Sequence, residues 1–197
     1  MIAVRSVLVA GIDFVLELTP IKYEDGRGYF SDVFNKAQLA RLGLSVDFVQ
    51  DNQSLSRSVG TVRGLHFQFA PYTQAKLVRV LRGAILDVAV DIRAGSPTFG
   101  QHVSIEISAA KWNQVFVPKG FAHGFCTLEP DTEVLYKVDA PYSLEHEGGL
   151  LWCDPDLRIA WPVDASSAVV SDKDKELPRL SNLTPDFVYS EVRNDQV

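Results

Sequence analysis

The sequence predicts a mainly β protein, built as a sandwich, barrel or jelly roll with only a few short helices. Short segments in the middle of the chain alternate apolar and polar residues with a period of two, the pattern of half-buried strands. Glycine and proline residues that favour turns separate these segments, and helical periodicity is scarce. Many short strands joined by regular turns are typical of such all-β architectures.

The first expected element is a short helix over residues 35–42. Asn35 suits the N-cap, because its side-chain oxygen can accept a hydrogen bond from a free N–H of the first turn. Gly43 follows the helix and can adopt the left-handed conformation in which many helices end.

Three strands are expected next, at residues 86–92, 103–107 and 133–138, where apolar residues occupy every second position. Turn sequences lie between them: Gly95-Ser96-Pro97, Pro118-Lys119-Gly120 and Glu129-Pro130-Asp131. A further helical turn is expected at 171–174, near the C-terminus.

The bulk composition indicates one globular domain. Of 197 residues, 46% are hydrophobic and 22% are charged, so we expect one domain over 1–185 and a mostly polar tail over 186–197. The net charge of −6 argues against a general nucleic-acid binder. Without a membrane-length apolar stretch or a clean signal peptide, a cytoplasmic protein with no membrane partner is expected. Cys126 and Cys153 are expected to be free, packed thiols.

The most informative histidine is His66, which lies between two cations, Arg63 and Lys76. A base beside fixed positive charges suits an anionic substrate and proton transfer, whereas the cations would repel a metal ion. His123 also lies just after a glycine-containing turn and close to an aromatic residue, although a structural core histidine would fit either position. The remaining histidines, His102 and His146, have polar neighbours and are expected at the surface.

Residues 118–123, Pro-Lys-Gly-Phe-Ala-His, resemble the Pro-x-Gly-x-x-His pattern of the second cupin motif. The resemblance implies a cupin-like double-stranded β-helix. A metal-binding cupin would also carry His-x-His followed by Glu, but this chain has His66-Phe-Gln68 and no Glu between 67 and 105. Two histidines beside a lysine do not supply the usual metal ligands, so no metal and no cofactor are expected.

A closer resemblance covers about residues 25–180. The motifs that carry it are Arg63-Gly-Leu-His66-Phe-Gln68, Ala75-Lys76-Leu-Val-Arg79, Ser96-Pro-Thr-Phe-Gly100, Pro118-Lys-Gly-Phe-Ala-His-Gly-Phe125, Leu135-Tyr136-Lys137 and Trp161-Pro162. In this order and spacing they resemble the dTDP-4-dehydrorhamnose 3,5-epimerase family. The resemblance implies inversion of carbons 3 and 5 of dTDP-4-dehydro-6-deoxy-D-glucose, in the supply of L-rhamnose for polysaccharides such as O-antigen.

The resemblance also implies roles for four residues. His66 would be the base, Asp174 its orienting carboxylate, Tyr136 the general acid, and Lys76 the cation that holds the enolate oxygen and touches phosphate. Without the resemblance, Asp174 fits a capping box with Ser171. Tyr136 would then be a core aromatic and Lys76 a solvated strand lysine.

Eight further residues match substrate-binding positions of the family: Arg27, Phe30, Gln50, Asn52, Arg63, His123, Tyr142 and Glu147. Arg27 and Phe30 match residues that reach the neighbouring subunit's site, which implies a homodimer. Tyr142 is the remaining candidate for stacking on thymine, because many members have two adjacent aromatics where this chain has Pro141-Tyr142.

Three other functions share parts of this pattern. An epimerase acting on carbon 3 alone would use almost the same residues. A non-catalytic sugar-nucleotide-binding cupin would keep Arg63, Lys76 and Gln50 but would not need the acid or base. A metal-dependent cupin would contain stoichiometric metal.

Overall fold

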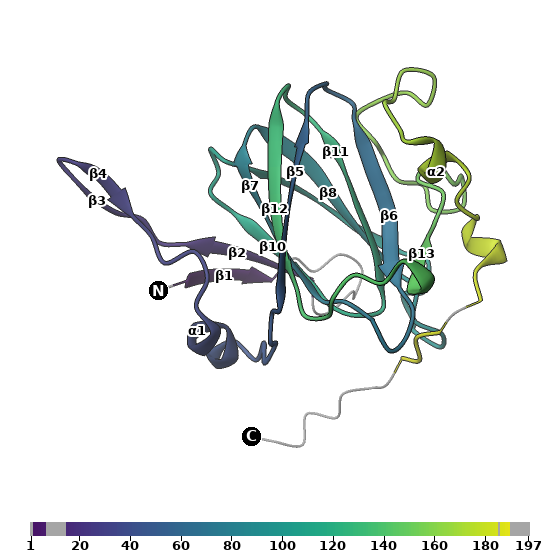
Figure 1. Ribbon diagram of the computed structural model, residues 1–197, viewed down its shortest axis with the longest axis horizontal. Helices are drawn as coiled ribbons and strands as arrows, with labels where there is room; N and C mark the ends of the chain where they lie inside the picture. The colour runs from purple at the N-terminus through teal and green to yellow at the C-terminus, as the bar shows by residue number, and fades with distance from the viewer. Residues whose placement is uncertain (1, 7–14, 185, 190–197) are drawn as a thin grey trace.

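The fold consists of two antiparallel sheets stacked face to face, which confirms the prediction of a mainly β, cupin-like jelly roll (Figure 1). The computed structural model describes residues 2–6, 15–184 and 186–189. One sheet contains, in spatial order, β1 (Ile2–Ser6), β2 (Leu16–Pro20), β10 (Gln114–Val117), β7 (Lys76–Arg82), β12 (Thr132–Val138) and β5 (Gln50–Ser56). The other contains β13 (Glu147–Gly149), β6 (Val62–Gln68), β11 (Phe121–Thr127), β8 (Ala84–Asp91) and β9 (His102–Ser108).

The helical elements are short. They are α1 (Lys36–Arg41), α2 (Asp172–Lys175) and the 3-10 turns η1 (Leu144–His146) and η2 (Leu180–Asn182). The helix expected at 35–42 is present: Asn35 accepts a hydrogen bond from the Gln38 N–H at 3.1 Å, and Gly43 ends it with a φ of 81°.

The main core lies between the two sheets. Val78 and Val134 meet Ile85, Val103 and Phe125 there, so inward-facing residues of both sheets close the interior.

A second cluster packs on the outer face of the five-stranded sheet, where Val88 and Val90 lie under Leu150 and Leu157. The strand expected at 86–92 is therefore not half-buried, because a largely irregular C-terminal segment covers the face that would otherwise meet water.

The backbones of β6 and β11 approach each other unusually closely at Gly64. This residue has a φ of 120°, and a Cβ there would lie 2.6 Å from Gly124 Cα. Only glycine fits such a position. In the resulting register His66 pairs with His123, and the pairing shifts between His123 and Phe125.

A small hairpin, β3 (Tyr23–Asp25) with β4 (Gly28–Phe30), extends away from the two sheets in Figure 1. Its six strand residues are all exposed, and Phe30 keeps 71% of its surface accessible. The hairpin carries Arg27 and Phe30, both expected at the site of a neighbouring subunit.

Cys126 and Cys153 are free thiols, as expected, although only Cys126 is buried. His102 and His146 are each partly buried rather than fully at the surface. The domain boundary at 185 stays a prediction, since 186–189 partly pair with Ala94 and 190–197 lie outside the described residues. Within the described ranges, no helix is long and apolar enough to cross a membrane.

Candidate active site

A cavity of about 540 Å³ opens between the sheets, and most of the predicted site residues line it. Seven predicted residues from six elements meet there: Arg63 and His66 from β6, Lys76 from β7, His123 from β11, Tyr136 from β12, Glu147 from β13 and Asp174 from α2. They span more than one hundred residues of sequence, so only the fold brings them together.

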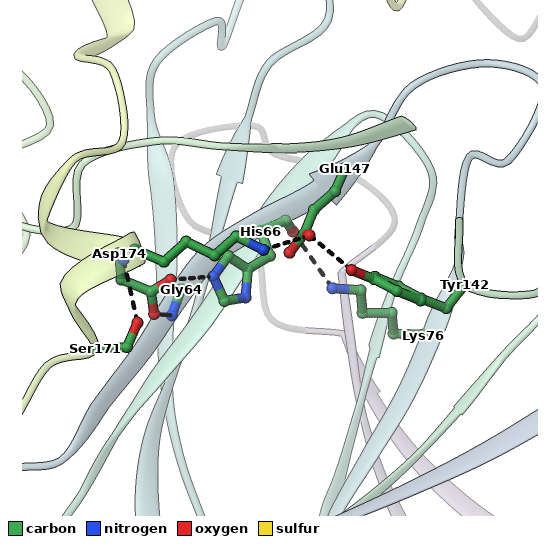
Figure 2. A network of polar contacts seen from close by, with 8 residues as sticks. Gly64, His66, Lys76, Tyr142, Glu147, Ser171 and Asp174 are labelled. Carbon is green, nitrogen blue, oxygen red and sulfur yellow. Dashed lines mark hydrogen bonds and ion pairs between the residues drawn. The ribbon is translucent and has the colours of Figure 1, made fainter. Parts of the chain in front are cut away.

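His66 and Asp174 form a tight pair at the cavity wall. The His66 Nε2 atom lies 2.7 Å from Asp174 Oδ1, and the other carboxylate oxygen accepts the Gly64 N–H at 3.2 Å. Figure 2 shows the ring with Asp174 on one side and Lys76 and Glu147 on the other. With Nε2 engaged by the carboxylate, Nδ1 is the ring nitrogen left for a substrate.

The Asp174 carboxylate is held in its ionised form. Burial alone would raise the pKa of Asp174, but the hydrogen bond and charge of His66, with the Gly64 N–H, bring it below the usual value. Ser171 caps α2 by accepting the Asp174 N–H at 3.1 Å. The N-cap expected from sequence is therefore present, while the carboxylate itself points to His66.

Lys76 is a buried cation with few protein partners. The residue is only 7% exposed, and the one hydrogen bond that its side chain makes to a described residue runs from Nζ to the His66 carbonyl at 3.3 Å. Burial lowers the pKa of Lys76 to about 8, while the charges of Asp87 and Glu147 oppose this shift. A desolvated ammonium with donors to spare favours an anionic ligand.

Tyr136 lies on β12 and packs partly against the interior core. Burial raises the pKa of its phenol, the Arg63 charge lowers it, and the Glu147 charge raises it further. The net upward shift keeps the hydroxyl protonated near neutral pH, so it can donate a proton into the cavity.

His123 is paired with a carboxylate, Asp87, for which the sequence predicted no functional role. Its Nε2 atom lies 2.8 Å from Asp87 Oδ2, and both side chains are almost fully buried. The only sequence signal for Asp87 was its place in the alternation of the strand at 86–92.

A second set of side chains forms the rim of the cavity. Glu147 accepts hydrogen bonds from the Tyr142 hydroxyl at 2.8 Å and from the Lys173 ammonium. Burial would raise the pKa of Glu147, but Lys173 and Tyr142 lower it overall. Gln50 accepts the Tyr142 N–H at 3.2 Å and donates to Asn52 at 2.7 Å, so the predicted Gln50, Asn52 and Tyr142 adjoin the cavity without lining it.

Arg63 reaches the cavity from β6 and is anchored by β5. Its Nε donates to Ser56 Oγ at 3.1 Å, and one terminal nitrogen donates to the Leu55 carbonyl at 3.2 Å. The guanidinium is exposed, so part of its donor set faces solvent at the cavity.

Arg27 and Phe30 do not reach this cavity. The Arg27 side chain is 91% exposed and pairs with Asp25 at 2.6 Å, out on the β3–β4 hairpin.

Lys173 lines the cavity although it was not predicted, and its position directly before Asp174 was the available signal. In the described part of the chain, no three His, Cys, Asp or Glu side chains cluster as a metal site would require.

A jelly-roll barrel whose cavity holds a His–Asp pair, a buried lysine and a buried phenol defines a cupin-like protein with an acid–base set of side chains. The family model of dTDP-4-dehydrorhamnose 3,5-epimerase matches residues 10–182. The chain belongs to the dTDP-4-dehydrorhamnose 3,5-epimerase family.

Individual relatives cover nearly the whole chain. The 3,5-epimerase of Sinorhizobium fredii is 52% identical over 175 residues, which are 89% of each protein. The Bacillus anthracis 3,5-epimerase, solved with TDP and PPi bound, is 49% identical with a TM-score of 0.84, covering 90% of this chain and 99% of that one. The Legionella pneumophila 3,5-epimerase, solved with dTDP-4-keto-L-rhamnose, is 39% identical with a TM-score of 0.88, covering 95% and 100%.

Proposed function

We propose that this protein inverts carbons 3 and 5 of dTDP-4-dehydro-6-deoxy-D-glucose and so forms dTDP-4-dehydro-L-rhamnose. The observation that carries the proposal is the meeting of His66, Lys76 and Tyr136 in one cavity, with Asp174 bound to His66. Membership of the 3,5-epimerase family supports the same reaction. So does the Legionella relative, which binds the keto-sugar nucleotide that the reaction would produce.

The chemistry follows from the ketone at carbon 4, which acidifies the C–H bonds on both flanking carbons. His66 Nδ1 takes the proton, and the electron pair moves through the new C=C bond onto the carbon-4 oxygen. Asp174 keeps the imidazole oriented by accepting the Nε2–H. Tyr136 then donates its hydroxyl proton to the opposite face of the same carbon, and exchange with solvent restores both residues.

Lys76 makes this weak base sufficient. A pKa gap of about ten units between the carbon acid and the imidazole corresponds to roughly 14 kcal/mol that the site must offset. A fixed ammonium beside the enolate oxygen, in a site with little water, can supply a large part of that energy. Lys76 is suited to this role because it is buried, largely charged at neutral pH and bonded to a single carbonyl among the described residues.

The remaining predicted residues are proposed to bind the nucleotide. Arg63 offers guanidinium N–H donors for phosphate oxygens at the cavity, and His123 offers an Nδ1–H donor when its ring is protonated on both nitrogens. At the rim, Gln50, Asn52 and Glu147 are proposed to contact the deoxyribose and base, and Tyr142 is proposed to stack on thymine. The exposed ring of Tyr142 supports that role.

We further propose a homodimer in which the β3–β4 hairpin of each chain reaches the site of the other. The support is the exposure of Phe30 and Arg27 on a hairpin that extends away from its own barrel. Tyr23, Tyr29 and Phe30 are each more than half exposed on this hairpin, and exposed apolar side chains that gather in one place favour an interaction surface.

The test is turnover of the dTDP-4-keto sugar in deuterated water, followed by NMR. We expect deuterium at both carbons 3 and 5. Label at carbon 3 alone would replace the proposal with a carbon-3 epimerase, and nucleotide binding without any exchange would indicate a binding protein. A bound metal that is stoichiometric and required for exchange would count against the metal-free mechanism.

The His66→Ala variant is the internal control for this assay. It should lose exchange at both carbons, while its affinity for dTDP stays close to that of the wild type because the base does not hold the nucleotide. Unchanged exchange would remove His66 from the role of base.

A further inference from the structure

Asp87 is a carboxylate buried inside the barrel without an assigned role. It lies on β8 between Ile85 and Ala89, which face the main core, and its side chain is 2% exposed. An ionised carboxylate in such apolar surroundings is costly unless it is paired and hydrogen-bonded. Its partners should therefore show what it is for.

The first partner is His123. Asp87 Oδ2 lies 2.8 Å from Nε2, which leaves Nδ1 as the second edge of the ring. No described residue hydrogen-bonds to Nδ1, and His123 lines the cavity. The carboxylate therefore fixes which edge of the imidazole meets a ligand.

The second partner is Lys76, through charge rather than contact. Burial lowers the pKa of Lys76, and the charge of Asp87 is the stronger of the two influences that raise it, ahead of Glu147. One buried carboxylate therefore serves two cavity-lining groups on different strands.

We propose that Asp87 is a positioning residue of this site, a buried counter-ion that aims His123 Nδ1 at the substrate and keeps the Lys76 ammonium charged. The site then contains two histidine–carboxylate pairs on neighbouring strands, since His123 and His66 are register partners. The His66–Asp174 pair moves protons. In the second pair Nε2–H donates to Asp87, and His123 in its doubly protonated form donates Nδ1–H to a phosphate oxygen of the substrate. This inference rests on the proposed epimerase function.

The other charged and titratable groups around Lys76 must be considered in any pH experiment. Those that line the cavity are Arg63 and His66 on β6, His123 on β11, Tyr136 on β12, Glu147 on β13, and Lys173 and Asp174 at α2. Replacing Asp87 leaves all of them in place.

The experiment compares Asp87→Asn with Glu106→Gln. The amide introduced by Asp87→Asn keeps the size of the side chain and an oxygen acceptor for Nε2, but the charge is gone. Glu106 lies on the adjacent strand β9, is exposed and pairs with Lys111, so Glu106→Gln removes one carboxylate outside the barrel.

We expect Asp87→Asn to lower kcat/KM for the exchange reaction by about 10- to 100-fold. Losses of this size are typical when a residue that orients a functional side chain is replaced. The alkaline limb of its pH profile should move to lower pH, because Lys76 loses its proton more easily, and dTDP should bind more weakly. Glu106→Gln should behave as the wild type. A profile for Asp87→Asn that matches the wild type, or one lowered equally at every pH, would overturn the proposal.

Two further measurements keep the proposal separable from the epimerase function and from misfolding. If the wild type shows no exchange, the epimerase function fails, while the pH dependence of dTDP affinity in the same variants still tests Asp87. If Asp87→Asn does not fold, NMR of nitrogen-labelled histidine in the wild type decides. His123 should carry a proton on Nε2, the nitrogen that faces Asp87, and a ring bare at Nε2 would refute the pairing.

Discussion

Lys76 lowers the stability of the protein, because its ammonium is buried. Its pKa is about 8 in the folded protein against 10.5 for a free side chain, so the unfolded chain holds the proton more tightly. At neutral pH this preference lowers the free energy of unfolding by about 3 kcal/mol. The penalty is complete below pH 8 and shrinks as pH rises toward 10.5, where the unfolded chain also loses its proton.

Replacing Lys76 with methionine should therefore stabilise the protein and inactivate it. At pH 7 we expect the free energy of unfolding of Lys76→Met to exceed that of the wild type by about 1 to 3 kcal/mol, with exchange at least about 100-fold slower. The stability gap should narrow above pH 8. Urea unfolding at pH 7 and at a pH above 8 measures the stability gap at each pH. Lys111→Met is the control for replacing an exposed lysine. A less stable Lys76→Met at pH 7 would contradict the argument.

Tyr136 should matter for returning the proton rather than for removing it. In Tyr136→Phe, loss of the hydroxyl should slow inversion by about 100- to 10,000-fold, the usual contribution of a positioned acid. Deuterium wash-in at carbon 3 without inversion should fall much less, since His66 and Lys76 stay in place. Comparing wash-in with product formation in one NMR time course tests this, and equal losses would argue against Tyr136 as the acid.

Residue chemistry was only partly readable from the sequence. His66 between Arg63 and Lys76 predicts an anionic, proton-transferring site from local order alone. The Asp87 side chain gave no comparable signal, because its partner is 36 positions away and only the β8–β11 pairing brings them together. The effect of a carboxylate depends on whether it is buried, and the alternating sequence pattern does not show that a strand is buried on both faces.

At the scale of elements, the close contact of β6 with β11 sets the spacing of the two histidines. Gly64 makes this contact possible, and its N–H also supports Asp174. Gly28 has nearly the same φ, 124°, but an added Cβ there would meet nothing within 4 Å. A comparison of alanine substitutions at Gly64 and Gly28 therefore separates the cost of backbone strain from the cost of a steric clash.

We expect Gly64→Ala to reduce the free energy of unfolding by about 1 to 3 kcal/mol more than Gly28→Ala. Both variants strain the backbone to a similar degree, but only Gly64→Ala must push two strands apart, at a cost of about 1 to 3 kcal/mol or more. Chemical denaturation of both variants measures the difference. Equal losses would mean that the β6–β11 contact yields without cost.

The helices and turns were more predictable than the layers. The Asn35 side chain caps the start of α1, the positive φ of Gly43 suits its end, and Ser171 caps α2. The covering of β8 by the segment around Leu150 and Leu157 was not predictable, because that segment has little regular structure and hence no period to read.

At the scale of the whole molecule, the barrel and the hairpin serve different sites under the proposed function. The cavity collects seven of the twelve predicted site residues within one chain. Arg27 and Phe30 lie on the β3–β4 hairpin, which extends away from the barrel of its own chain, so their predicted roles require a second chain. Resemblance to the family was the only sequence signal for this exchange, since no local pattern distinguishes a partner's site from the chain's own.

Mixing two inactive variants tests the exchange directly. In a mixed dimer of His66→Ala and Arg27→Ala, the chain that carries Arg27→Ala keeps His66, and its partner supplies an intact Arg27. One site per mixed dimer is then complete, while the other lacks both residues. Random reassortment makes half of the dimers mixed, so about a quarter of wild-type activity should return. If Arg27 acted within its own chain, no site would be repaired, and the mixture would show only the average of the two variants. Reassortment should be verified by mass spectrometry of differently tagged chains. A mixture of His66→Ala with Asp174→Asn is the control, because both residues lie in the same cavity, and it should stay as inactive as its components.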